Sequence, residues 1–284
     1  AARVLFREFR RLLLSRTWRC CVCTHFLPSQ LAAGRPGLPP FVQVMTDFVL
    51  HRYWVQPRVR DHFVAGPDIA RDLAGRILAV RVQATGIPIS PVFERPLQAA
   101  EARTEWGLDC ARPVALVMGG GLGLGVETAA VASLAADVPG LQIVAVTGRN
   151  TAAKARLERL GVPADLLRVL GYVQGMERLL PAADVVVTKP GGLTTSEALA
   201  VGKPLILTRP IPGHEAANLE FLRSRGVALA APRDSELTVV LARFFREPAL
   251  QQSLASTARA MGAPGAARRI ARAVRRRHML EAAA

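Results

Sequence analysis

The pattern of hydrophobic and polar positions divides the chain into two halves of different regularity. After residue 113, short uninterrupted Val/Ile/Leu runs alternate with mixed segments of helical period. Such runs indicate strands buried on both faces, and their alternation with helices predicts a parallel, doubly wound α/β sheet. We expect strands at 114–118, 141–147, 167–173, 184–188, 204–208 and 227–230, and helices at 126–136, 151–160, 177–183, 194–201 and 215–225.

The first half has shorter and less regular runs. An Arg/Leu segment at 1–19 predicts an amphipathic helix, and Asp68 is placed to cap a helix at 68–76. Buried strands are expected at 20–24, 41–45 and 62–65.

A stiff, proline-containing segment at 86–91 indicates a linker. We therefore predict one domain at 1–95 and a second at 96–284. The end of the second domain is predicted to be helical, with Pro248 and Pro264 at helix starts.

The charge balance is strongly basic, with 37 Lys+Arg against 22 Asp+Glu and a formal net charge of +15. Such a field attracts phosphates on nucleic acid, on an anionic bilayer or on a nucleotide. No nucleic-acid-binding module is recognisable, so no nucleic-acid partner is expected. No long apolar run or secretory leader is visible, which predicts a cytoplasmic protein. Because residue 1 is Ala, we expect the sequence to begin inside a longer gene product.

Three of the four cysteines, Cys20, Cys21 and Cys23, fall in one apolar run near His25. Their spacing matches neither a zinc clip nor a disulfide framework. The favoured interpretation is a buried strand that uses Cys as a small hydrophobic residue.

A glycine loop, Gly119 to Gly125, separates an expected strand from an expected helix. Its glycines let backbone N–H groups approach a phosphate, although a tight turn alone explains them too. The dinucleotide pattern is not met, and Arg149 stands near the place where a ribose-binding acid is expected for NAD. The candidate phosphate-binding positions are Gly119, Gly120, Gly121, Gly123 and Arg149.

A second loop runs from Lys189 through Gly191 and Gly192 into a helix that Thr194 is placed to cap. We predict Glu197 to lie in the first turn of that helix. The carboxylate either stabilises the helix start or accepts hydrogen bonds from two ribose hydroxyls. The candidate residues are Lys189, Gly191, Gly192, Leu193, Thr194 and Glu197.

A third loop opens the next helix and contains Pro212, Gly213, His214, Glu215 and Asn218. The last three place polar groups close together at a helix start, where they could contact sugar hydroxyls. An ordinary solvated helix start is the alternative.

Together the three loops carry a family resemblance. The stretch 189–198 followed by 212–218 resembles the bacterial diacylglycerol glucosyltransferases and the plant-type monogalactosyldiacylglycerol synthases of the GT-B superfamily. The resemblance places Tyr172 and Val173 beside the uracil. The family usually has Gln where His214 stands, so the identity of the sugar stays open. Segments of the first half are similar to the acceptor-side domain: 23–28, 44–54, 63–65 and 85–89.

This resemblance implies two Rossmann-like domains facing a cleft, with the N-terminal domain incomplete, because no Gly-Gly-Gly-His type loop precedes residue 1. It implies inverting transfer of a hexose from a UDP-sugar to diacylglycerol or a glycosyldiacylglycerol. Asp47 and His51 are the candidate catalytic residues on the acceptor side, with a capping Asp and a loop His as the alternative. No Asp-x-Asp motif occurs, so neither a metal nor another cofactor is expected.

Two other functions stay open. One is a lipid II type UDP-GlcNAc transferase, and the other is a non-catalytic UDP-sugar-binding, membrane-associated remnant. The basic helix at 3–16 either docks on an anionic membrane, which would make the protein peripheral on the inner face of the cell membrane, or packs on its own domain.

Overall fold

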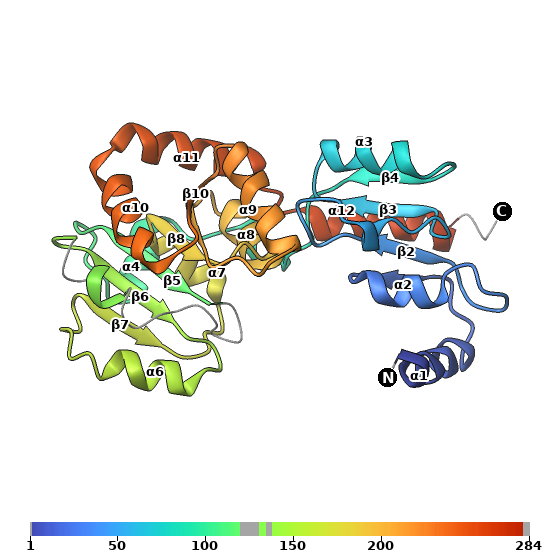
Figure 1. The fold of residues 1–284 in the computed structure, drawn as a ribbon, viewed down its shortest axis with the longest axis horizontal. Coiled ribbons are helices and arrows are strands. Elements are labelled where there is room, and N and C mark those ends of the chain that lie inside the picture. The colour runs from blue at the N-terminus through green and yellow to red at the C-terminus, as the bar shows by residue number, and fades with distance from the viewer. Residues whose placement is uncertain (1, 120–130, 135–137, 281–284) are drawn as a thin grey trace. The chain divides into compact units, whose positions relative to one another are not determined.

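The computed structural model describes residues 2–119, 131–134 and 138–280. The chain forms two compact units (Figure 1). Residues up to Pro91 and from Gly265 onward belong to the first unit, and Val92–Pro264 to the second.

The second unit is built on a parallel sheet of short strands, most of which are buried. The strand order across the sheet is β10-β9-β8-β5-β6-β7. All five residues of β5 and all five of β6 are buried, as expected for a sheet covered on both faces. The strands are β5 (Val114–Met118), β6 (Gln142–Val146), β7 (Leu167–Leu170), β8 (Val185–Thr188), β9 (Leu205–Thr208) and β10 (Ala228–Ala231).

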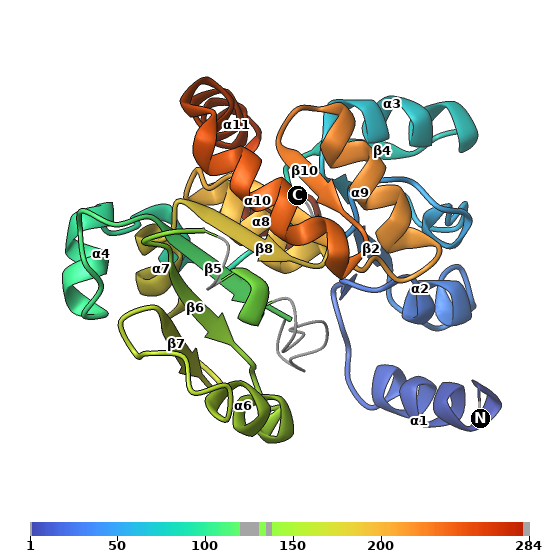
Figure 2. The ribbon, with the colours of Figure 1, turned by 60° about the vertical axis from the view of Figure 1, so that its left-hand side comes forward.

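Helices surround this sheet. One of its faces packs against Leu157 of α6, Leu241 of α10 and Leu254 of α11. Figures 1 and 2 both show α6 running beside β7. The helical elements are α4 (Ala99–Glu105), α6 (Thr151–Glu158), α7 (Met176–Leu179), η3 (Leu180–Ala182), α8 (Gly192–Ala200), α9 (His214–Ser224), α10 (Asp234–Arg246) and α11 (Pro248–Met261).

The first unit contains a smaller parallel sheet in the order β1-β2-β3-β4. One face packs Phe63 against Ile270 and Val274, and the other packs Val64 against Leu73. The strands are β1 (Cys21–Cys23), β2 (Phe41–Val44), β3 (Asp61–Val64) and β4 (Arg81–Ala84). The helical elements are α1 (Ala2–Leu14), α2 (Phe26–Ala32), η1 (Arg52–Trp54), α3 (Pro67–Arg76), α12 (Ala266–Arg275) and η4 (Arg276–Leu280), with η2 (Pro91–Glu94) at the boundary with the second unit.

The predicted doubly wound α/β class is confirmed, and the six expected strands of the second unit are present with small shifts at their ends. Of the helix expected at 126–136, only 131–134 lies within the described residues. The sequence missed β4, whose residues are mixed in polarity and only partly buried or exposed.

Two predicted helix caps are wrong. Gly66, not Asp68, is the N-cap of α3, and Asp68 instead lies in the first turn. Gly191, not Thr194, is the N-cap of α8, because the helix begins at Gly192. Both helices therefore start earlier than the position of a polar capping residue suggested.

The last helix lies in the first unit, whereas the predicted domain boundaries group it with the second. Arg269 of α12 donates to the carbonyl of Thr85 at 2.8 Å, and Arg277 of η4 donates to Asp61 at 2.7 Å. Pro264 precedes α12, which begins at Ala266, while Pro248 is the first residue of α11.

Two other sequence features can be placed. Cys23 is buried in β1, and its Sγ lies 3.8 Å from that of Cys21. Within the described ranges, no three or more His, Cys, Asp or Glu side chains gather as metal ligands. No helix among the described residues has the length and apolarity needed to span a bilayer.

Candidate active site

The strand order of the second unit reverses between β5 and β8. These neighbouring strands are paired so that Met118 lies opposite Thr188. From β5 the chain continues outward through β6 and β7, and from β8 it continues the other way through β9 and β10. Ligands of doubly wound sheets bind beyond the carboxyl ends of the strands at such a switch point. The first two candidate loops follow these two strands directly.

The glycine loop begins at this point. Gly119 follows β5 immediately. The other three predicted positions, Gly120, Gly121 and Gly123, lie outside the described residues.

The loop after β8 leads from Lys189 to the start of α8. Gly191 is the N-cap of α8, and a methyl group added to it would meet no atom of the described residues within 4 Å. The backbone is thus open to a ligand at a helix N-terminus, where unpaired N–H groups attract an anion. Lys189, Gly192 and Thr194 are partly exposed, and Leu193 is 53% exposed.

Glu197 lies in the second turn of α8 rather than in the predicted first turn. Its side chain is largely buried, and no described residue donates a hydrogen bond to its carboxylate. Burial first, and the negative charge of Glu177 second, raise the pKa of Glu197 to about 7. A desolvated carboxyl with unused acceptors, beside a switch point, is typical of a ligand-binding position. The importance of Glu177 was not visible in the sequence, because it depends on how α7 packs.

The third loop is held to the second by a buried side chain. Asn218 of α9 is fully buried, and its Nδ2 donates to the carbonyl oxygen of Pro190 at 3.1 Å. Its amide therefore links the loops after β8 and β9. Glu215 accepts a hydrogen bond from the backbone N–H of Ile211 at 2.8 Å. Three of the predicted positions are exposed, Pro212, Gly213 and His214.

Arg209 directly follows β9, at the start of the third loop, and was not among the candidate residues. Its φ is +43°, in the left-handed region that costs non-glycine residues free energy. Two hydrogen bonds to Asp234, at 2.8 and 2.7 Å, hold its guanidinium. Such strain is common where a loop is shaped for a ligand.

The loops after β6 and β7 also meet. The guanidinium carbon of Arg149 lies 5.4 Å from the ring centroid of Tyr172, and both side chains are exposed. Val173 is partly buried. The structure thus brings together two residues predicted from separate motifs, and their roles toward a nucleotide stay predictions.

In the first unit, the candidate catalytic pair is in contact. The Nε2 of His51 lies 3.3 Å from Oδ2 of Asp47, and the same carboxylate oxygen accepts a 2.8 Å hydrogen bond from Nε1 of Trp54. Asp47 follows β2, so the pair lies at the carboxyl edge of the smaller sheet. A carboxylate that orients a histidine is the arrangement of a general base.

Aromatic rings enclose His51. Its ring centroid lies 5.6 Å from that of Phe26, 5.8 Å from that of Tyr53 and 5.7 Å from that of Trp54. Phe26 and Tyr53 are themselves stacked at 5.1 Å. The sequence analysis predicted Asp47 and His51 as candidates but not Phe26, which lies in α2, before β2 in the chain.

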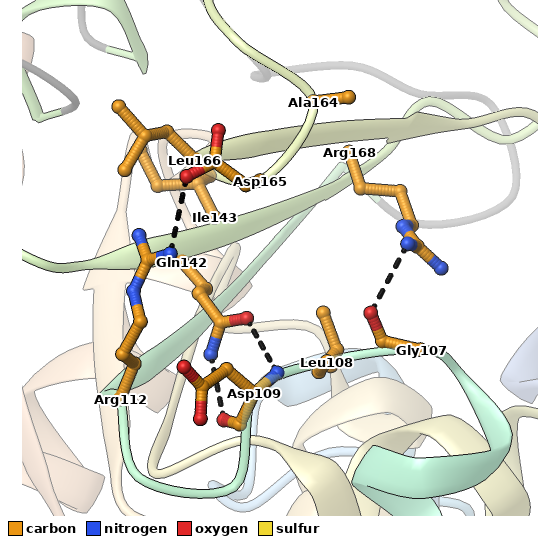
Figure 3. A pocket seen from close by; sticks show the side chains of 10 residues that line it. All are labelled: Gly107, Leu108, Asp109, Arg112, Gln142, Ile143, Ala164, Asp165, Leu166 and Arg168. Atoms are coloured by element: carbon orange, nitrogen blue, oxygen red, sulfur yellow. Dashed lines mark hydrogen bonds and ion pairs between the residues drawn. The ribbon is translucent and has the colours of Figure 1, made fainter.

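A cavity of about 390 Å³ opens at the other edge of the larger sheet (Figure 3). Gln142, the first residue of β6, exchanges hydrogen bonds with the backbone of Asp109 there, and Arg112 pairs with Asp165 at 3.2 Å. Because this is the amino edge, it is not where a doubly wound sheet binds its ligand. The two arginines of its lining, Arg112 and Arg168, are matched by two aspartates.

Comparisons with solved structures define the class of fold. Acinetobacter baumannii MurG matches with a TM-score of 0.64 and 18% identity, over 97% of this chain and 77% of that one. The glycotransferase of kitacinnamycin matches with a TM-score of 0.72 and 19% identity, over 98% of this chain and 80% of that one. The fold is therefore that of the GT-B glycosyltransferases.

The family follows from the sequence comparisons. The glycosyltransferase family 28 C-terminal domain matches residues 114–267, more than half of the chain, and monogalactosyldiacylglycerol (MGDG) synthase matches residues 2–89. The chain belongs to glycosyltransferase family 28. The resemblance predicted from the loops at 189–198 and 212–218 is thereby confirmed.

Curated relatives include two enzymes named processive diacylglycerol beta-glucosyltransferase. That of Bacillus subtilis is 36% identical over 204 residues, and that of Bacillus licheniformis is 33% identical over the same length. Each match covers 70% of this chain and 52% of the relative. The chain thus spans about half the length of these relatives.

Proposed function

We propose that this protein transfers a hexose, with inversion, from a UDP-sugar to diacylglycerol or a glycosyldiacylglycerol. The observation that carries the proposal is the position of Glu197, a largely buried carboxyl beside the open Gly191 loop at the switch point of the sheet. Membership of glycosyltransferase family 28 and the names of the curated relatives support a nucleotide-sugar donor and a lipid acceptor.

The donor half of the proposal assigns a role to each loop. The ionised carboxylate of Glu197 accepts hydrogen bonds from the two ribose hydroxyls. Lys189 and the first N–H groups of α8 offset the charge of the diphosphate, which grows as UDP leaves. Arg149 and Tyr172 lie on the uracil side, and His214 and Glu215 contact the sugar. Asn218 acts through Pro190, by fixing the loop between them.

The acceptor half assigns the base to His51. Because Nε2 faces Asp47, the nitrogen that takes the proton of the lipid hydroxyl is Nδ1, which is buried in the free protein and has to be uncovered when the acceptor binds. The hydroxyl oxygen bonds to the anomeric carbon from the side opposite UDP, and the bond to UDP breaks. Asp47 orients the ring and stabilises the imidazolium that forms. Trp54 holds Asp47 in place through its 2.8 Å hydrogen bond.

A membrane role for α1 belongs to the same proposal. Leu13 packs into its own domain with Cys23 and Phe41, whereas Leu12 and Leu14 are about half exposed. Trp18 is also exposed. Exposed apolar side chains among arginines favour docking on an anionic bilayer, which would place the protein peripherally on the inner face of the cell membrane.

The first test is UDP binding by calorimetry. We expect saturable binding by the wild type and binding weakened at least fivefold by Glu197→Ala. Glu220→Ala, which removes an exposed carboxylate of α9 that pairs with nearby Arg223, is the matched control and should bind as the wild type does. Undetectable UDP binding by the folded wild type would contradict the donor assignment.

The second test concerns the acceptor. Diacylglycerol in vesicles and an undecaprenyl-linked muramyl peptide compete as acceptors, with UDP-glucose and UDP-GlcNAc each supplied as donor. This distinguishes the proposal from a lipid II type GlcNAc transferase, which the likeness in fold to MurG keeps open. UDP binding without transfer to either acceptor would instead favour a non-catalytic remnant.

A further inference from the structure

A buried carboxylate at the amino edge of the smaller sheet gathers three basic side chains. Asp61, the first residue of β3, is 2% exposed. Arg81, the first residue of β4, donates to it from Nε at 2.8 Å and from Nη2 at 2.6 Å. Arg277 donates to Oδ1 at 2.7 Å, and Nε2 of His278 lies 3.2 Å from Oδ2.

These side chains line a cavity of about 470 Å³ within the first unit. Gly34, Arg58 and Arg60 also line it. β3 and β4 are parallel, and Asp61 and Arg81 are the first residues of these two strands. The cavity is therefore at the opposite edge of this sheet from Asp47 and His51, which follow the end of β2.

The charges in this cavity do not balance. Four arginines face one aspartate, which leaves a formal excess of three positive charges even with His278 neutral. Arg58 and Arg60 are exposed, and neither forms an ion pair with any described residue. Burial tends to raise the pKa of Asp61, but Arg81, Arg277 and His278 outweigh it and lower that pKa, so the carboxylate stays ionised and holds these groups.

Two of the four guanidinium groups, those of Arg81 and Arg277, are held in place before any ligand arrives. Asp61 and Gln83 fix Arg277, and the stem of Arg58 packs beside Gly34. A methyl group at Gly34 would lie 3.0 Å from Cδ of Arg58, and the backbone there has φ +70°. Ordered guanidinium groups in a concave, positively charged site match the geometry and charge of a phosphate.

We propose that this cavity binds a phosphate group, separately from the donor site. The phosphate belongs either to a small soluble phosphate ester or to the headgroup of an anionic lipid. Either source presents the same phosphate group to Arg58, Arg60 and Arg277. Titrations with a soluble phosphate and with lipid vesicles distinguish the two sources.

The test compares two double variants that remove the same charge. Arg58→Gln with Arg60→Gln removes the exposed arginines of the cavity and leaves Asp61 with its partners. Arg71→Gln with Arg76→Gln removes two arginines of α3 in the same unit. Each protein is titrated with inorganic phosphate at constant ionic strength, and then with vesicles of phosphatidylcholine that contain or lack phosphatidylglycerol.

We expect the cavity variant to lose binding at least fivefold relative to the wild type and to the α3 variant, for phosphate, for the anionic vesicles or for both. Loss in the phosphate titration alone identifies a soluble ligand, and loss with vesicles identifies a lipid headgroup. Equal binding by the two variants in both titrations would overturn the proposal. All three proteins should bind UDP equally, so a failure of the donor assignment is recognised separately.

Discussion

Glu197 lies within electrostatic reach of Glu177, although the two are on different helices, α8 and α7. Burial of Glu197 and then the charge of Glu177 bring its pKa to about 7, from an ordinary value of 4.5. At neutral pH the carboxyl therefore exchanges between protonated and ionised forms. Hydroxyl groups that donate to it favour the ionised form.

UDP affinity should depend on the ionisation of Glu197. Between pH 6 and pH 8 the ionised fraction rises steeply, so we expect the wild type to bind UDP up to about tenfold more tightly at pH 8. Glu197→Gln has no such group and should lack this increase. Calorimetry at both pH values measures the change in UDP affinity. Because UDP itself titrates, this change is compared between the wild type and the variant. An equal pH dependence of both proteins would argue against ribose binding by Glu197.

The same raised pKa affects stability without ligand. Protonated Glu197 stabilises the fold fully below pH 4.5, and this contribution is lost as the pH rises through about 7. Glu197→Gln should therefore be more stable than the wild type at pH 8, by as much as roughly 3 kcal/mol, with little difference at pH 4. Urea unfolding at the two pH values measures this. A variant that is less stable than the wild type at pH 8 would show that Glu197 has favourable partners in the free protein.

Lys203 gives the opposite case. Burial, and after it the charges of Arg103 and Arg259, lower the pKa of Lys203, while the charge of Asp184 raises it. The net result is a pKa lowered from 10.5 to about 8. Neutral Lys203 stabilises the fold above pH 10.5, and this contribution is lost as the pH falls through about 8. Lys203→Met should raise stability at pH 7 by as much as roughly 3 kcal/mol, and thermal unfolding at pH 7 tests it. Lys154→Met, at a partly exposed position of α6, is the control and should change stability little.

The acceptor-side pair should affect turnover rather than donor binding. Asp47→Asn keeps the size of the side chain but removes the charge that stabilises an imidazolium, so we expect kcat to fall about a hundredfold. Trp54→Phe removes the donor to Asp47 and also part of a buried ring, so turnover should fall about fivefold or more, with some loss of stability. Transfer assays with UDP binding measured in parallel check both. A loss of UDP affinity equal to the loss of turnover would point to a folding defect instead.

One glycine outside the site is fixed by packing. A methyl group at Gly262, which ends α11, would lie 2.4 Å from the carbonyl oxygen of Leu199 in α8. Gly262→Ala should therefore destabilise the fold by about 2 kcal/mol or more, because backbone must move. At Gly75, in α3, the added methyl meets nothing within 4 Å, so Gly75→Ala should be neutral or slightly stabilising. Urea unfolding of both variants tests the difference.

Most strands of the second unit were predictable because they are short, buried apolar runs, although β7 and β10 are only partly buried. Residues 114–118 and 185–188 show this clearly. The strand at 81–84 could not be found in this way, since Arg81 and Gln83 interrupt it and its residues are partly buried or exposed. Helix starts were less predictable, because glycines rather than polar side chains are the caps at Gly66 and Gly191.

The candidate site was predictable where motifs follow strands, because parallel strands end at one edge of a sheet. Arg149 was a candidate because it follows a strand and Tyr172 because of the family resemblance, and the two side chains do meet. Contacts between distant segments were not predictable. The link from Asn218 to Pro190 and the meeting of Asp61 with Arg277 depend on packing that no local pattern records.

The attachment of residues 265–280 to the smaller sheet has a consequence for the order of folding during synthesis. Val92–Pro264 is continuous, so the second unit can fold as soon as it has left the ribosome. Asp61 and Phe63, in contrast, emerge long before the residues that cover them, Arg277 and Val274. The first unit is thus begun first and completed last, and until then β3 exposes a charged and an apolar side chain that the finished protein buries.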